Sequence, residues 1–185
     1  VRFQGQEVCA VIADDPYIAK DACSKIVVDY EILPAIVNPL QAADPASVLI
    51  RDDKENQPGN KVFDWEIGDK AGTDKAFAAA DKISKIELHY PRTHPSPLEC
   101  CGSIADYDRA TGKLTVYMTS QAPHIVRAAV AMVAELPEHM IRIVSPDLGG
   151  GFGNKVPIYP GYVISILASI LTEKPVKWIE DKTGN

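Results

Sequence analysis

Cysteine is scarce in this sequence, and its spacing excludes several kinds of metal and redox site. The four cysteines stand at positions 9, 23, 100 and 101 of 185 residues. No two are spaced as C-x-x-C, so neither a zinc site nor an iron–sulfur cluster is predicted, and adjacent cysteines rarely form a disulfide with each other. We therefore expect buried, reduced thiols in a cytoplasmic protein.

The sequence also lacks a concentration of positive charge and a long apolar run. Its 19 Lys and Arg residues are interspersed with 25 Asp and Glu residues, for a net charge of −6. A nucleic-acid surface needs a clustered basic face, so that class of function is not expected. The longest apolar stretch, residues 162–171, has about half of the ~20 residues that a membrane span requires, and we expect a buried helix there.

No leader sequence is recognisable at the start. Val1 opens directly into strand-like sequence, without the basic and apolar segments of a secretory signal. At the other end, a strand-like stretch at residues 174–180 is followed by only five residues. We therefore expect a piece of a longer polypeptide, incomplete at both ends.

In the first ninety residues, strand-like and helix-like stretches alternate. Asp15 followed by Pro16 is the favoured pairing of a helix N-cap with proline at the first helical position. The periodicity predicts a helix at residues 16–24 and a second helix that Thr73 caps and that runs through Asp81. Strands are expected at residues 7–13, 26–30, 35–37, 63–67 and 85–90. This pattern predicts a β-α-β unit in the first forty residues, followed by an irregular surface excursion at residues 41–60.

The pattern is clearer in the second half of the sequence. Strands are expected at residues 102–107, 114–119, 141–144 and 176–179, with a hairpin signal at Thr111-Gly112. Helices are expected from residue 123 to about residue 135 and around residues 162–171. Strands that alternate with helices indicate an α+β (mixed α/β) fold.

Residues 149–155 read Gly-Gly-Gly-Phe-Gly-Asn-Lys and lie between an expected strand and an expected helix. Three consecutive glycines cost backbone entropy, so a stable protein keeps them where a side chain cannot fit. Backbone N–H groups at such a place commonly meet an anionic ligand. Lys155 is not followed by Ser or Thr, and Asn154 replaces the last glycine of G-x-G-x-x-G, so neither nucleotide motif fits. We predict a loop that lets a bulky, flat ligand approach the backbone; a tight turn around a core Phe152 is the plainer alternative.

Two further stretches contain side chains that could carry chemistry. In Thr-Ser-Gln-Ala-Pro-His (119–124), Pro123 suits a first helical turn, so the amide of Gln121 could donate to a negatively polarised oxygen. A plain helix cap is the alternative, and His124 is interpreted as a packed or surface histidine. In His-Pro-Ser-Pro-Leu-Glu (94–99), the prolines force an extended chain, which favours a structural role over a metal or acid–base site.

Taken together, these stretches resemble one family. The motifs that carry the resemblance are VRFQGQEV (1–8), VDYEILP (28–34), WEIGDK (65–70), HPSPLE (94–99), TSQAPH (119–124), SPD (145–147), GGGFGNK (149–155) and PVKW (175–178). They are similar to the large, molybdenum-binding subunits of the xanthine oxidase and aldehyde oxidase family of molybdenum hydroxylases, above all its carbon monoxide-oxidising branch. Purine hydroxylases of the family carry a glutamate where Val156 stands, which argues against purine hydroxylation.

The resemblance implies a fold and a site. Residues 1–80 would form an α/β hammerhead-like domain, incomplete at its N-terminus. Residues 81–185 would form the start of a molybdopterin-binding domain, incomplete at its C-terminus. The cofactor-binding residues would be Gly150, Gly151, Phe152 and Gly153. Gln121, as the catalytic residue, would hydrogen-bond an apical oxygen ligand of the metal; no residue of this sequence is expected to ligate the metal.

The resemblance also implies an activity: oxidation of carbon monoxide with water to carbon dioxide. Two electrons would pass to iron–sulfur clusters and FAD on an iron–sulfur subunit and a flavin subunit, in a cytoplasmic dimer of heterotrimers. The cofactor would be molybdopterin cytosine dinucleotide with molybdenum, and copper at the same site. Two alternatives stay open: an aldehyde- or N-heterocycle-oxidising hydroxylase, and a non-catalytic binding or assembly module. The stretch alone is expected to be inactive, because the family's copper-binding cysteine and active-site glutamate have no counterpart in it.

Overall fold

The computed structural model describes residues 1–53 and 59–183, which fall into two compact units. The first unit consists of Val1, Phe3–Ile26 and Arg92–Asn185, and the second of Arg2 and Val27–Pro91. The predicted division near residue 80, between a hammerhead-like domain and a molybdopterin-binding domain, stays a prediction.

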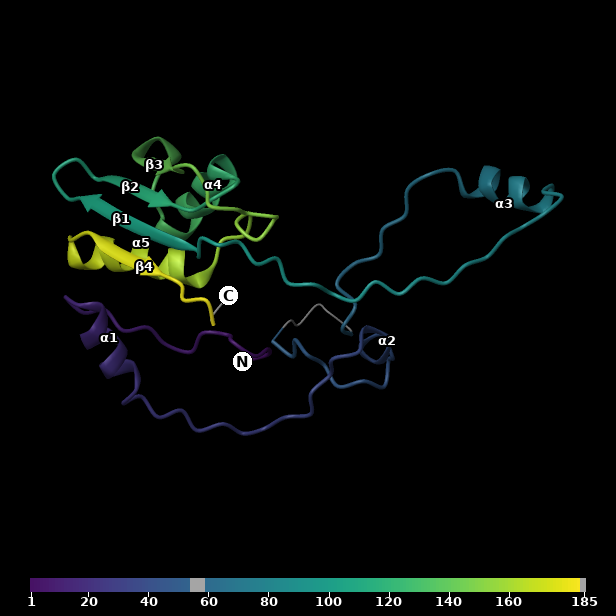
Figure 1. Cartoon of the computed structure of the whole chain (residues 1–185), viewed down its shortest axis with the longest axis horizontal. Helices are drawn as coiled ribbons and strands as arrows, with labels where there is room; N and C mark the ends of the chain where they lie inside the picture. Colours follow the sequence, from purple (N-terminus) through teal and green to yellow (C-terminus); the bar gives the residue numbers. More distant parts are fainter. Residues whose placement is uncertain (54–58, 184–185) are drawn as a thin grey trace. The chain divides into compact units, whose positions relative to one another are not determined.

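The first unit is built on a four-stranded mixed sheet (Figure 1). Its strands are β1 (Gly102–Asp108), β2 (Lys113–Met118), β3 (Ile141–Val144) and β4 (Val176–Ile179). They are ordered β3-β2-β1-β4, with β1 antiparallel to both of its neighbours and β3 parallel to β2. The four strands predicted in this half of the sequence are confirmed, and so is the α+β class.

One face of the sheet forms the core because buried and more exposed side chains alternate along its strands. Leu114, Val116 and Met118 of β2 are buried, and the residues between them are not. The register places Met118 opposite Ser103 and Val116 opposite Ala105, and these two β1 residues are buried as well. Successive side chains of a strand point to opposite faces, so these residues line one apolar face. That face is covered by two helices.

The covering helices are α4 (Pro123–Ala134) and α5 (Pro160–Thr172). Both begin with a proline in the first turn, where its missing N–H leaves no helical hydrogen bond unmade. Val126 and Val130, four positions apart on α4, are buried. Helix α5 buries one side along its length and packs against β1 and β4. Each helix ends at a residue in the left-handed conformation, Glu135 and Glu173.

Short helices start at side-chain caps, where a side-chain oxygen accepts a backbone N–H of the first turn. The helix predicted at residues 16–24 is α1 (Pro16–Cys23), capped by Asp15 through the N–H of Tyr17. The second unit contains α2 (Pro39–Ala42), capped by Asn38, and α3 (Lys70–Ala78). The N-cap of α3 was predicted at Thr73, which was wrong by four residues, because Asp69 is the cap and accepts from the N–H of Gly72.

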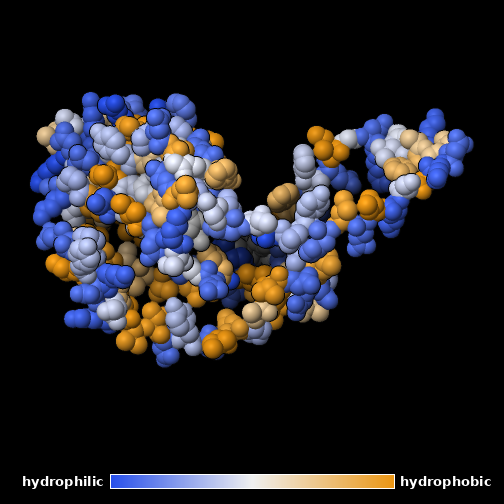
Figure 2. Space-filling view, viewed as in Figure 1, coloured by the Kyte–Doolittle hydropathy of each residue, from blue (hydrophilic) through white to orange (hydrophobic). Residues whose placement is uncertain are grey.

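The strands predicted at residues 7–13, 26–30, 35–37, 63–67 and 85–90 do not form among the described residues, so the predicted β-α-β unit was wrong. A strand needs a hydrogen-bonded partner, and the described chain offers these segments none. Val27, Ile32 and Val37 are each at least 92% exposed, and Figure 2 shows apolar residues at the surface. Local β-preference alone therefore did not produce a ladder.

Asn60 organises part of the excursion predicted at residues 41–60. Its side-chain amide donates to the carbonyls of Ala42 and Val48 and accepts from the N–H of Ile50. Residues 54–58 of this excursion lie outside the described residues. Among the helices that the structure describes, none has the length and apolar character of a membrane span.

Gly161, in the first turn of α5, provides a test of this packing. It is buried, and a Cβ at this position would lie 2.1 Å from the indole of Trp178 in β4. We expect Gly161→Ala to lower the free energy of unfolding by about 1–3 kcal/mol through overpacking, although alanine is the better helix former. Urea unfolding measures this, with Gly59→Ala as the matched control, because a Cβ there meets nothing within 4 Å. Equal stability of the two variants would contradict the packing described here.

Candidate cofactor site

The topology brings four chain segments to one edge of the sheet. Strands β2 and β3 are parallel, so both end at this edge, and β4 also ends there. Strand β1 runs the other way and begins there. The segments that precede β1 and that follow β2 and β3 therefore meet. A direct contact confirms it, since the hydroxyl of Ser145 donates to the carbonyl of Ser120 over 2.6 Å.

Gln121 follows β2 and contacts the glycine loop (residues 149–155), which follows β3. Its Oε1 accepts hydrogen bonds from the N–H of Gly153 at 3.1 Å and of Lys155 at 3.2 Å. Its backbone N–H donates to the carbonyl of Lys155 at 2.9 Å. Because Oε1 is held by two backbone donors, the amide's own donor, Nε2, is the part that remains for another acceptor. The structure thus brings together the residues that the sequence nominated.

The glycine loop presents a short row of backbone donors. Among the described residues, none accepts a hydrogen bond from the N–H of Gly150, Gly151 or Phe152. The amides that follow are used internally, with Asn154 donating to the carbonyl of Gly151 at 2.9 Å. Successive backbone N–H groups in a loop of this kind form a site that suits an anion. The loop therefore fits a cofactor that carries negative charge.

The glycines are required by close contacts. A Cβ at Gly151 would lie 2.5 Å from Cδ of Gln121, so the space beside this glycine is filled by the glutamine amide. Gly150 has a φ of +98°, and a Cβ there would lie 3.2 Å from Cβ of the buried Pro97. Phe152 is 76% exposed with a φ of +53°, so the alternative of a turn around a core phenylalanine was wrong.

An ion pair beside the loop was not predicted from the sequence. Nζ of Lys155 lies 2.5 Å from Oε2 of Glu99; the lysine side chain is fully buried, and that of the glutamate is 37% exposed. The same oxygen accepts the N–H of Gly149 at 2.9 Å. The hydrogen bond from Lys155, and then that from Gly149, hold the pKa of Glu99 below its usual value. A lysine directly after a glycine-rich loop was the available signal, but its partner lies 56 positions away in the chain.

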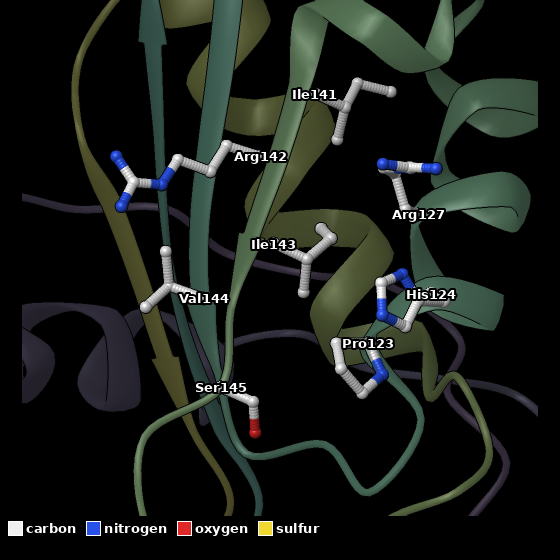
Figure 3. Close-up of a pocket in the computed structure, with 8 residues that line it drawn as sticks. All are labelled: Pro123, His124, Arg127, Ile141, Arg142, Ile143, Val144 and Ser145. Carbon is white, nitrogen blue, oxygen red and sulfur yellow. The ribbon is translucent and has the colours of Figure 1, made fainter.

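Other nominated residues lie apart from the loop. His124 is exposed and borders an open hollow of about 470 Å³ between the start of α4 and β3 (Figure 3). His94 is exposed, and the described part of the chain contains no cluster of three or more side chains suited to a metal. Of the cysteines expected to be buried, Cys101 is, and burial raises its pKa, whereas Cys9 and Cys23 are exposed.

The fold and the site thus define a domain that offers an anionic cofactor a glycine-rich loop beside a fixed glutamine amide. Residues 53–185 match the molybdopterin cofactor-binding domain family. This match covers more than half of the sequence, and the chain belongs to that family.

Similar proteins agree with this assignment. The carbon monoxide dehydrogenase large chain of Hydrogenophaga pseudoflava is 50% identical over a match that covers all of this chain and 24% of that protein. Reconstituted CO dehydrogenase from Oligotropha carboxidovorans has a TM-score of 0.85 at 47% identity, covering 94% of this chain and 23% of that one. Quinoline 2-oxidoreductase from Pseudomonas putida 86 has a TM-score of 0.77 at 31% identity, covering 93% and 21%. The resemblance found in the sequence is confirmed, and the chain spans about a quarter of the length of these proteins.

The pair of Glu99 and Lys155 predicts a pH dependence of stability. Because the folded-state pKa of Glu99 is depressed, its contribution is present above the pKa of an unfolded glutamate, about 4.3, and is lost as the pH falls through the folded-state pKa. Glu99→Gln should therefore destabilise the protein at pH ~7 and destabilise it less at pH ~3, measured by urea unfolding.

The exposed pair of Arg127 and Glu138 provides the control. Glu138→Gln should change stability little at either pH, since an exposed ion pair contributes little. A Glu99→Gln effect of the same size at both pH values would show that the charge of Glu99 is not what stabilises the loop.

Proposed function

We propose that this chain forms part of the cofactor-binding wall of a molybdenum hydroxylase that oxidises carbon monoxide with water to carbon dioxide. The overall change releases two protons and two electrons. The observation that carries the proposal is the row of backbone donors at Gly150, Gly151 and Phe152 beside the amide of Gln121. Sequence identity of 50% to a carbon monoxide dehydrogenase large chain supports this substrate.

In this proposal the glycine loop binds the cofactor, and Gln121 orients an oxygen that carries negative charge. The N–H groups of Gly150, Gly151 and Phe152, with the backbone at Gly153, would hold an anionic oxygen of a molybdopterin cytosine dinucleotide. Nε2 of Gln121 would donate to an oxygen that carries negative charge, while Oε1 keeps the side chain in place through its two backbone donors. The bound molybdenum cofactor, with copper beside it, would supply the redox chemistry.

The electrons need carriers that this chain does not provide. None of its four cysteines belongs to an iron–sulfur spacing. We propose that an iron–sulfur subunit and a flavin subunit carry them, in a cytoplasmic dimer of heterotrimers. Oxidation of an aldehyde or an N-heterocycle is the second candidate, and the 31% identity to quinoline 2-oxidoreductase supports an N-heterocycle. A non-catalytic assembly module would contain no molybdenum, so metal analysis of the full-length protein with its partners separates it from both.

Gln121→Glu is the sharpest test of the glutamine. Glutamate keeps an oxygen that can accept from Gly153 and Lys155 but has no amide donor. In the full-length enzyme we expect kcat for carbon monoxide oxidation to fall on the order of 10²-fold, with molybdenum content per subunit nearly unchanged. Gln121→Ala should lower both quantities, because it also releases the loop. Unchanged kcat in Gln121→Glu would reduce Gln121 to a residue that holds the loop.

Gly151→Val tests the loop itself. A branched side chain fits only if the amide of Gln121 moves away, because even a Cβ would lie 2.5 Å from its Cδ. We expect the full-length variant to lose most of its molybdenum, measured by metal analysis of protein that remains folded by circular dichroism. Ala128→Val on the exposed surface of α4 is the control, and it should keep full molybdenum content. Normal molybdenum content in Gly151→Val would count against the loop as the cofactor site.

A further inference from the structure

A single carboxylate oxygen holds both ends of the glycine loop. Oε2 of Glu99 accepts the N–H of Gly149, the first residue of the loop, at 2.9 Å. It also accepts a hydrogen bond from Nζ of Lys155, the last residue of the loop, at 2.5 Å. The backbone N–H of Glu99 donates to the carbonyl of Gly149 at 3.2 Å, so the first glycine is fixed from both sides. The ion pair thereby closes residues 149–155 into a ring.

Lys155 connects this ring to Gln121. Its backbone N–H donates to Oε1 of Gln121, and its carbonyl accepts the N–H of Gln121. Its side chain is fully buried and ends on Glu99. A buried ammonium group needs a charged partner, because desolvation without one is very costly. A change at Glu99 therefore reaches Gln121 through Lys155, although no direct contact is needed between the two.

We propose that Glu99 and Lys155 are positioning residues that fix the shape of the glycine loop before the cofactor arrives. Four of the seven residues in this loop are glycine, which leaves its free backbone with many accessible conformations. A ligand that had to order such a loop would lose affinity. The closed ring keeps the N–H groups of Gly150, Gly151 and Phe152 together in advance. This proposal rests on the proposed function, in which those N–H groups meet an anionic cofactor.

The surroundings of the pair agree with a positioning role. The carboxylate of Glu99 neutralises Lys155, so the pair adds no net charge to attract the cofactor. The segment before β1 also packs on the loop, because the buried Pro97 lies against Gly150. Nζ of Lys182, after β4, donates to the carbonyl of Pro97 and secures that segment. The segment that contains Glu99 is therefore held in place, as it must be if the ion pair is to fix the loop.

The double variant Glu99→Met with Lys155→Met separates positioning from stability. Replacing a buried ion pair by two apolar side chains is often neutral for stability, whereas breaking it from one side is not. We expect thermal stability near that of the wild type but exchange of the hydrogen-bonded Gly153 and Asn154 amides at least about tenfold faster in the cofactor-free full chain. This double variant should also contain several-fold less molybdenum after expression with the full assembly.

Single variants complete the test. Lys155→Met alone should give the same fast exchange with lower stability, and it should also contain several-fold less molybdenum. Unchanged amide exchange in the double variant would overturn the proposal, as would faster exchange with full molybdenum content. Exchange is read without the cofactor, so a wild-type protein that contains no molybdenum would refute the proposed function while leaving the ring itself measurable.

Discussion

Parallel pairing of β2 and β3 is the constraint on which the site depends. Parallel neighbours need a long crossover, and here α4 supplies it and covers the core face of the sheet. The pairing sends the ends of both strands to one edge, where the antiparallel β1 begins. Gln121 and the glycine loop therefore meet although more than twenty-five residues separate them. If β3 ran the other way, the loop would leave the sheet at the opposite edge.

At that edge, neighbouring side chains occupy the space that a Cβ at the loop glycines would need. Gly151 leaves room for the amide of Gln121, and Gly150 leaves room for Pro97. The glycines thus serve the protein's own packing first, and their N–H groups become available to a ligand as a result. From the sequence, the glycines were expected to let a ligand approach the backbone directly. In the structure the glutamine amide fills the space beside Gly151 and accepts hydrogen bonds from the backbone of Gly153 and Lys155.

Sequence patterns correctly predicted the elements that are stabilised by segments close to them in the sequence. Alternation identified β1 and β2, which a hairpin joins, and the proline at residue 123 marks a true helix start. The segments at residues 7–13 and 26–30 have the same β-preference but no ladder among the described residues. Strand formation depends on pairing between distant segments, and a local pattern carries no information about that.

The pair of Glu99 and Lys155 shows the same difference at the level of single residues. The sequence set Glu99 beside His94 as a possible cluster, yet the prolines between them hold the chain extended. The true partner became visible only when the fold brought the segment before β1 against the loop after β3. Because the side chain of Lys155 is buried away from water, its charge requires the carboxylate of Glu99 as a partner. A loop with four glycines is thereby held by Glu99 and Lys155, neither of which belongs to the row of N–H groups at Gly150, Gly151 and Phe152.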